Sequence, residues 1–78
     1  MDLARMRQGK NQSFEEFVAA WKKVVTYIEL SEKELKQMLI KSLRDEVMLE
    51  FFNYLGQPLA EMILSMIRKE RHLMKIDL

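Results

Sequence analysis

Apolar residues recur at helical spacing along most of the chain. Starting at Phe14, they follow at i, i+3, i+4, i+7, i+10, i+11 and i+14, which places them on one face of a helix that reaches Ile28. Ser13 stands directly before this set and Glu16 follows three residues later, which is the spacing of a capping box. The pattern therefore predicts a helix over about residues 14–28.

The same start signal is repeated further along the chain. Ser31 and Glu34 form a second capping-box pair, and Leu30 and Leu35 stand where a hydrophobic staple would close the start of a helix. The apolar spacing then continues to Leu43. We predict a second helix from about residue 32 to residue 43.

Two more helices are predicted in the second half. Asp45 is placed to cap a third helix that Gly56 would end, and Pro58 suits the first turn of a fourth. The third helix is expected to contain the apolar residues Val47, Met48, Phe51, Phe52, Tyr54 and Leu55. The fourth is expected to turn Leu59, Met62, Ile63, Met66, Ile67 and Leu73 inward. No alternating strand pattern or internal repeat occurs. The predicted fold class is all-α.

The domain organisation follows from these ranges. Residues 1–12 are expected to form a short N-terminal arm, in which Gly9 allows a positive φ or a tight turn. Residues 13–73 are expected to form a compact four-helix domain, and residues 74–78 a tail.

Composition excludes several classes of protein. The chain has 78 residues, of which 49% are hydrophobic, and it has no cysteine and a net charge of +1. A disulfide scaffold, a thiol enzyme and a cysteine-based zinc site are therefore excluded. Glu61, Ser65 and Arg68 interrupt the most apolar stretch, so no membrane span is expected. The near-neutral charge argues against a polybasic nucleic-acid or membrane binder.

The sequence offers no constellation for catalysis. The single histidine, His72, lies near the predicted end of the last helix, where its charge would favour the helix dipole. We expect no enzyme activity, no cofactor, no metal and no small-molecule substrate. A basic cluster lies at the same end of the chain and consists of Arg68, Lys69, Arg71, His72 and Lys75. Glu70 and Asp77 reduce its net positive charge, which favours a solvated helix end. Weak, salt-sensitive RNA contact remains as an alternative.

The second predicted helix has an unusually wide apolar arc. Leu35, Met38, Leu39, Ile40 and Leu43 sweep roughly 200° of the helix, against about 100° for an ordinary surface helix. Such a helix is either central in its bundle or in contact with another molecule. Because a domain of this size has little room to enclose a helix, we expect a partner surface here, for which flexible methionine is well suited.

The stretch from Arg7 to Trp21 resembles the major homology region of retroviral and retrotransposon capsid proteins. That region has a Gln-Gly pair, an acid three residues later, and an amphipathic helix with aromatic residues at this spacing and an arginine near its middle. The matching residues are Gln8, Gly9, Phe14, Phe17, Val18 and Trp21, whereas Gln12 stands in place of the acid and Ala20 in place of the arginine.

The resemblance continues beyond this motif and covers about residues 3–72. Residues 34–43 are similar to the second helix of the capsid C-terminal domain, and residues 54–62 to the approach to its last helix. The amino-acid sequence of residues 13–21 is most similar to that of Gag proteins of gypsy-type LTR retrotransposons.

The resemblance implies a short arm and four helices that dimerise through the second helix. By position, it assigns dimer contacts to Leu35, Met38 and Leu39, the homology-region turn to Gln8, Gly9 and Gln12, and core positions to Phe14, Phe17, Val18 and Trp21. The implied function is that of a Gag capsid C-terminal domain, whose homodimers and higher assemblies build a virus-like particle shell in the cytoplasm. Because no capsid N-terminal domain or Cys-His zinc knuckle is present, we expect an excised domain or a truncated product.

Two alternatives stay open at this point. A domesticated Gag module or a SCAN-like dimerisation module of a host protein would keep the fold and change its use. A helical nucleic-acid-binding domain would instead rely on the basic cluster.

Overall fold

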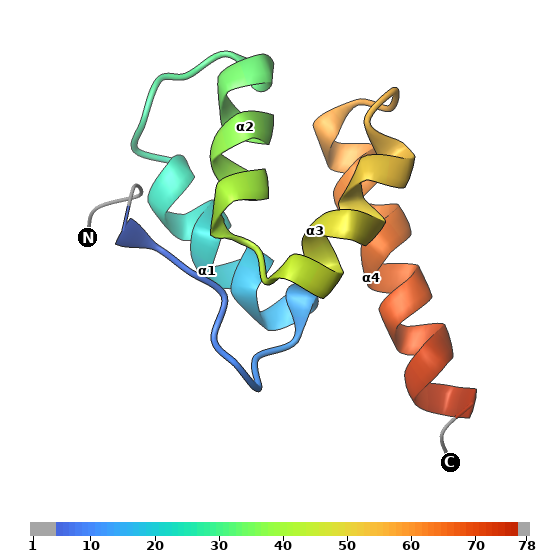
Figure 1. Cartoon of the computed structure of the whole chain (residues 1–78). Coiled ribbons are helices and arrows are strands. Elements are labelled where there is room, and N and C mark those ends of the chain that lie inside the picture. The colour runs from blue at the N-terminus through green and yellow to red at the C-terminus, as the bar shows by residue number, and fades with distance from the viewer. Residues whose placement is uncertain (1–4, 77–78) are drawn as a thin grey trace.

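The structure, a computed structural model, describes residues 5–76 and the side chains of residues 5–73. In the order of the chain, its elements are α1 (Phe14–Val25), α2 (Glu32–Ser42), α3 (Asp45–Phe51), the short 3₁₀-helix η2 (Phe52–Tyr54) and α4 (Leu59–Ile76) (Figure 1). The described part contains no strand. The fold is thus all-α, with a short arm before four α-helices, as predicted.

Both serine caps form, and local bonds explain where the first helix ends. The hydroxyl oxygen of Ser13 accepts from the backbone N–H of Glu16, and Ser31 and Glu34 form a complete capping box at the start of α2. Helix α1 ends at Val25, three residues before the predicted Ile28. The N–H of Thr26 still donates to the carbonyl four positions back, whereas those of Tyr27 and Ile28 donate to carbonyls three positions back, so the chain leaves the helix in a tighter turn.

The start and end of α3 differ from the prediction. Asp45 is the first helical residue and not the cap; the cap position is held by Arg44, whose side chain makes no capping bond. The helix tightens into η2 after Phe51. Gly56 lies beyond η2 without a positive φ, so it does not end a helix in the left-handed conformation.

The start of α4 is fixed partly by α2. Pro58 precedes α4, and its carbonyl accepts the first helical bond, from Met62, at 2.9 Å. The Glu32 carboxylate of α2 accepts from the backbone N–H of Leu59 at 3.3 Å, and the Lys36 ammonium donates to the Gln57 carbonyl at 2.8 Å. These bonds hold the first turns of α2 against the loop before α4.

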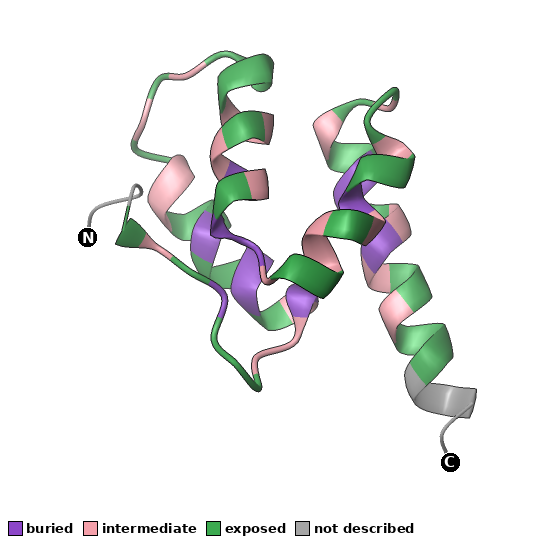
Figure 2. Ribbon diagram, viewed as in Figure 1, coloured by how far each residue is buried: buried purple, intermediate pink, exposed green. Residues whose placement is uncertain are grey.

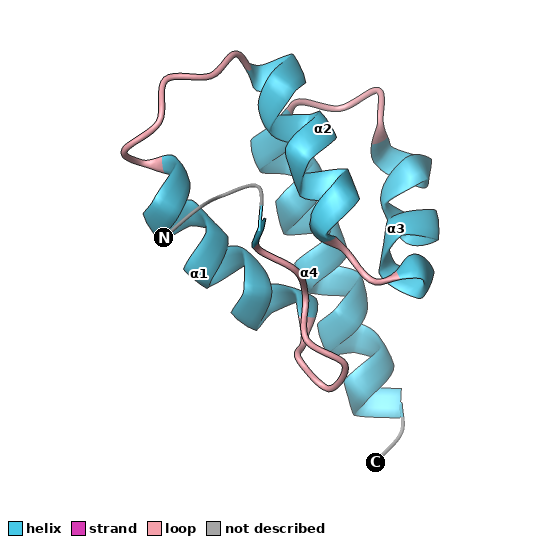
Figure 3. Cartoon of the chain, turned by 60° about the vertical axis from the view of Figure 1, so that its left-hand side comes forward, coloured by secondary structure: helices cyan, strands magenta, loops and turns pink. Residues whose placement is uncertain are grey.

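A single apolar core lies where the helices meet. Figure 3 shows α2 crossing in front of α4, with α1 and α3 on either side, and Figure 2 shows the buried positions facing inward from each helix. The residues predicted as core, Phe14, Phe17, Val18 and Trp21, are each only 2% exposed. They share the core with Leu39, Leu43, Phe51, Met62, Ile63 and Met66.

Replacement of Trp21 by alanine should destabilise the monomer strongly. Removal of a fully buried aromatic side chain leaves a cavity and costs about 3–5 kcal/mol in the free energy of unfolding. Trp21→Phe is the control, because it keeps an aromatic ring and removes the indole N–H, which has no hydrogen-bond partner in the structure. Urea unfolding followed by circular dichroism measures both variants, and a Trp21→Ala protein as stable as the Trp21→Phe protein would contradict a core role.

Candidate functional site

The arm reaches α1 through a turn closed by Gln12. Its backbone N–H donates to the Gly9 carbonyl at 3.2 Å, and its side-chain oxygen accepts from the Gly9 N–H at 3.0 Å. Gly9 has no positive φ, so of the two conformations that the sequence allowed at this position, the structure has the tight turn and not the left-handed one. Gln12, which replaces the acid of the resembled motif, closes this turn with neutral hydrogen bonds.

Gln8 fastens this turn to the junction between α2 and α3. It is buried, and its backbone N–H donates to the carbonyl of Ser42 at 2.8 Å. Its side-chain amide donates to the Gln12 carbonyl at 2.9 Å, while its side-chain oxygen accepts from the Arg44 N–H at 3.2 Å. The Arg44 guanidinium in turn donates to the Lys10 carbonyl. The three turn residues are therefore brought together, and the anchor on residues 42–44 is an additional feature that the sequence did not indicate.

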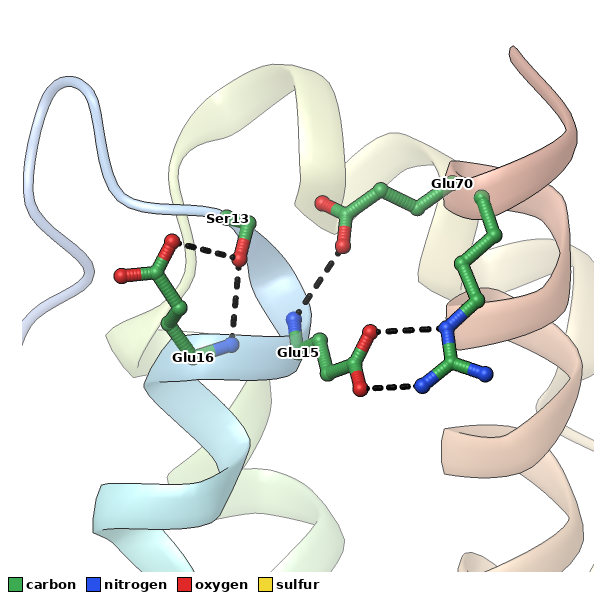
Figure 4. A network of polar contacts seen from close by, with 5 residues as sticks. Ser13, Glu15, Glu16 and Glu70 are labelled. Carbon is green, nitrogen blue, oxygen red and sulfur yellow. Dashed lines mark hydrogen bonds and ion pairs between the residues drawn. The ribbon is translucent and has the colours of Figure 1, made fainter. Parts of the chain in front are cut away.

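A carboxylate from α4 caps the start of α1. The Glu70 oxygens accept from the backbone N–H of Phe14 at 2.7 Å. They also accept from the backbone N–H of Glu15 at 3.2 Å (Figure 4). Ser13 accepts the next amide, that of Glu16, at 3.1 Å. The first three amides of α1 are thus all satisfied, two of them by a residue near the other end of the chain. Sequence reasoning missed this role, because Glu70 reads only as an acid within a basic cluster.

The two residues next to Glu70 in the sequence, Lys69 and Arg71, each form an ion pair. Arg71 donates to both carboxylate oxygens of Glu15, and Lys69 donates to Glu50. The hydrogen bond from Arg71 lowers the pKa of Glu15 and that from Lys69 lowers the pKa of Glu50, while the same bonds raise the pKa of each cation. All four groups lie near the solvent, so these pairs are weak individually.

The ion pairs change the picture of the basic cluster. Lys69 and Arg71 are neutralised by carboxylates, and Arg68 is exposed without an ion pair among the described residues. His72 is exposed, and the side chain of Lys75 lies outside the described residues. The cluster therefore offers less positive charge for phosphates than the sequence suggests.

The apolar arc of α2 is largely explained by burial within the monomer. Leu39 is 0% exposed, so its predicted contact with a partner is wrong in this conformation and its place is the core. Leu43 is also buried, and Ile40 is half-buried against the core. Leu35 and Met38 are half-buried and keep part of their surface in solvent.

The most exposed large apolar side chains lie away from α2. Tyr27 is 89% exposed just after α1. Leu49, Phe52 and Leu55 follow one another at intervals of three along α3 and η2, and Leu64 and Leu73 are exposed on α4. Leu73, which was predicted to point inward on the fourth helix, is therefore exposed instead.

The described residues contain no cluster for metal chemistry and no membrane-length helix. No three His, Cys, Asp or Glu residues among them lie close enough to hold a metal ion. No described helix is both long and apolar enough to cross a bilayer. The chemistry that this part of the chain does offer is apolar contact, backbone capping and ion pairing.

Comparisons of the chain with protein-family models, with curated proteins and with solved structures give no match.

Loss of the Glu70 carboxylate should loosen the start of α1. Glu70→Ala leaves two helix-start amides without their acceptor, and loss of such a cap costs about 0.5–2 kcal/mol in the free energy of unfolding. Glu70→Gln keeps one acceptor oxygen and should cost less. Hydrogen exchange at the amides of Phe14 and Glu15 measures the effect locally; unchanged exchange in Glu70→Ala would show that the bonds do not form in solution.

Acidification should weaken the fold through the two ion pairs. The folded pKa values of Glu15 and Glu50 are lowered, so their contribution is complete above the unfolded pKa of about 4.3 and is lost as the pH falls through the lower folded values. Urea midpoints measured from about pH 6 to about pH 3 should fall. The doubly substituted Glu15→Gln, Glu50→Gln protein is the control, and an equally steep fall in that protein would contradict this assignment.

Proposed function

We propose that the chain is a self-association domain of the Gag capsid C-terminal type, which pairs through α2 and helps to build a virus-like particle shell in the cytoplasm. The observation that carries this proposal is the turn of Gln8, Gly9 and Gln12. Gln8 and Gly9, which match the resembled motif, and Gln12, which replaces its acid, form one hydrogen-bonded unit, and this unit leads directly into the amphipathic helix α1.

The turn also bears on the proposed pairing helix. The Gln8 N–H donates to the carbonyl of Ser42, the last residue of α2, and the N–H of Arg44, within the α2–α3 junction, donates to the side-chain oxygen of Gln8. The arm therefore fixes the end of α2 within the monomer. A helix held in this way presents its outer side chains in a set geometry, which reduces the entropy lost on pairing.

The contact residues on α2 differ from those assigned by the resemblance. Leu35 and Met38 are three residues apart on one face and keep exposed surface, so they are the proposed contacts. Leu39 lies beneath them in the core and supports the helix from inside. In a two-fold symmetric pair, each copy would present this same face. A contact of this size, below about 1,200 Å², gives the weak and reversible pairing that suits assembly from many copies.

RNA is a secondary partner in this proposal. Arg68 is exposed and has no ion pair among the described residues, whereas Lys69 and Arg71 are paired, so any phosphate contact would be weak and sensitive to salt. The proposed function therefore rests on pairing between copies and involves no catalysis and no cofactor.

Met38→Ala should weaken dimerisation and leave the helices intact. Truncation of an interface anchor costs more than about 1 kcal/mol of binding energy, and about 1.4 kcal/mol raises the Kd tenfold. Sedimentation velocity over a range of protein concentrations measures the Kd, and circular dichroism monitors the fold. Lys33→Ala is the matched control, because Lys33 is exposed on α2 and lies on a different face from Met38.

Leu39→Ala separates core effects from interface effects. Because Leu39 is fully buried, this variant should lose about 2–5 kcal/mol in the free energy of unfolding. A Met38→Ala protein that still sediments as the parent dimer, or a parent chain that stays monomeric at the highest soluble concentration, would refute pairing through α2.

A further inference from the structure

A shallow apolar hollow lies at the start of α1, between α3 and α4. Its apolar walls come from Phe14 of α1, Val47 of α3, and Met66 and Leu73 of α4. Its volume is about 200 Å³, below the roughly 300–1,000 Å³ of pockets that hold small-molecule ligands. A hollow of this size suits one large side chain better than a cofactor.

The rim of this hollow is negatively charged. Three carboxylates surround it, those of Glu46, Glu50 and Glu70, and one ammonium, that of Lys69. Lys69 is already paired with Glu50, and the Glu70 oxygens accept from backbone amides, which carry no net charge. Glu46 is exposed and has no ion-pair partner among the described residues. An occupant with an apolar tip and positive charge beside it would complement this rim.

The opposite end of α1 carries an apolar tip, Tyr27, with two lysines before it and one exposed carboxylate, Glu29, after it. The Tyr27 ring, at 89%, is the most exposed of the large apolar side chains that the structure describes. Lys22 and Lys23 lie in the last turn of α1 just before it, both exposed and both without an ion pair in the described part of the chain. An aromatic ring so fully in water gains free energy when it is buried.

We propose that Tyr27 of one copy inserts into the hollow at the start of α1 in a second copy, with Lys22 and Lys23 facing the carboxylates of Glu46 and Glu70. The two surfaces are complementary in charge: two ammonium groups meet a rim whose carboxylates outnumber its ammonium groups by two. This complementarity selects a second copy of the chain as the occupant.

The geometry makes this contact head-to-tail. The 12 residues of α1 separate the hollow from Tyr27, and a helix of that length spans about 18 Å. Figure 1 shows the start of α1 beside α3 and its end on the far side of the molecule. One monomer therefore cannot fill its own hollow. A head-to-tail contact adds copies into a ring or a chain, unlike the symmetric pairing proposed for α2, on which it does not depend.

The test uses complementary variants in a Met38→Ala background, which reduces any contribution from the α2 contact. Tyr27→Ala removes the inserted ring but keeps the hollow, and Glu46→Lys reverses the rim charge but keeps Tyr27. Each variant alone should self-associate at least tenfold more weakly than the Met38→Ala parent in sedimentation experiments. An equimolar mixture should recover one contact, because each variant supplies the half that the other lacks.

Further variants and conditions make the result specific. Leu73→Ser alters the hollow at a half-exposed α4 position and should behave as Glu46→Lys does, whereas Leu64→Ala, an exposed α4 position outside the hollow, should leave association unchanged. The complex formed by the mixture should weaken as the salt concentration rises from about 0.01 M to about 1 M, over which the screening length falls from about 30 Å to about 3 Å.

Two results would overturn the head-to-tail contact. In the first, both variants are folded by circular dichroism, but their mixture sediments as monomers. The Tyr27 ring of a second copy would then not occupy the hollow. In the second, Tyr27→Ala alone associates as strongly as the Met38→Ala parent. Neither result bears on the α2 pairing, which the Met38→Ala and Lys33→Ala proteins test separately.

Discussion

The arrangement of the chain depends most on the hydrogen bonds that the carboxylate of Glu70 accepts from the start of α1. A helix begins with amides that have no partner in their own helix, and at α1 two of these find their acceptor in α4. This bond sets the first turn of α1 against α4, which brings Glu15 to Arg71 and places Phe14 beside Met66. Glu32 acts in the same way at the start of α4. Two of the four α-helices in the described part therefore begin on a carboxylate from a distant helix, and these bonds fix helix positions that a small core alone would hold loosely.

The features that the sequence predicts well are those determined by neighbouring residues. Ser13 and Ser31 cap their helices because the residue three positions on completes a local bond, and the apolar face of α1 is buried because its spacing is regular. Long-range roles could not be predicted. Glu70 gives no local sign of capping a helix that begins 56 residues earlier. Phe52 and Leu55 lie at the start of η2 and just after it, where α-helical spacing no longer holds, and both are exposed.

The width of the apolar arc on α2 shows how one pattern fits two physical situations. An arc of this kind arises when a helix pairs with another molecule, and also when it lies between neighbours in its own domain. The complete burial of Leu39 shows that the second situation accounts for the centre of the arc, whereas Leu35 and Met38 at its edge keep the surface on which pairing would depend. The exposed apolar groups outside α2 add apolar surface that the described monomer leaves in solvent. Together, the two contacts proposed above, one symmetric and one directional, would extend in more than one dimension, as a closed shell requires.

The buried indole of Trp21 has a spectroscopic consequence. It is the single tryptophan of the chain, it lies in the core, and its N–H group has no partner in the structure. Its fluorescence therefore originates from one site that is shielded from water in the folded monomer. Light emitted from this site reports whether the core around Trp21 is intact. In this chain the loss of tertiary structure can thus be followed by intrinsic emission without an added label.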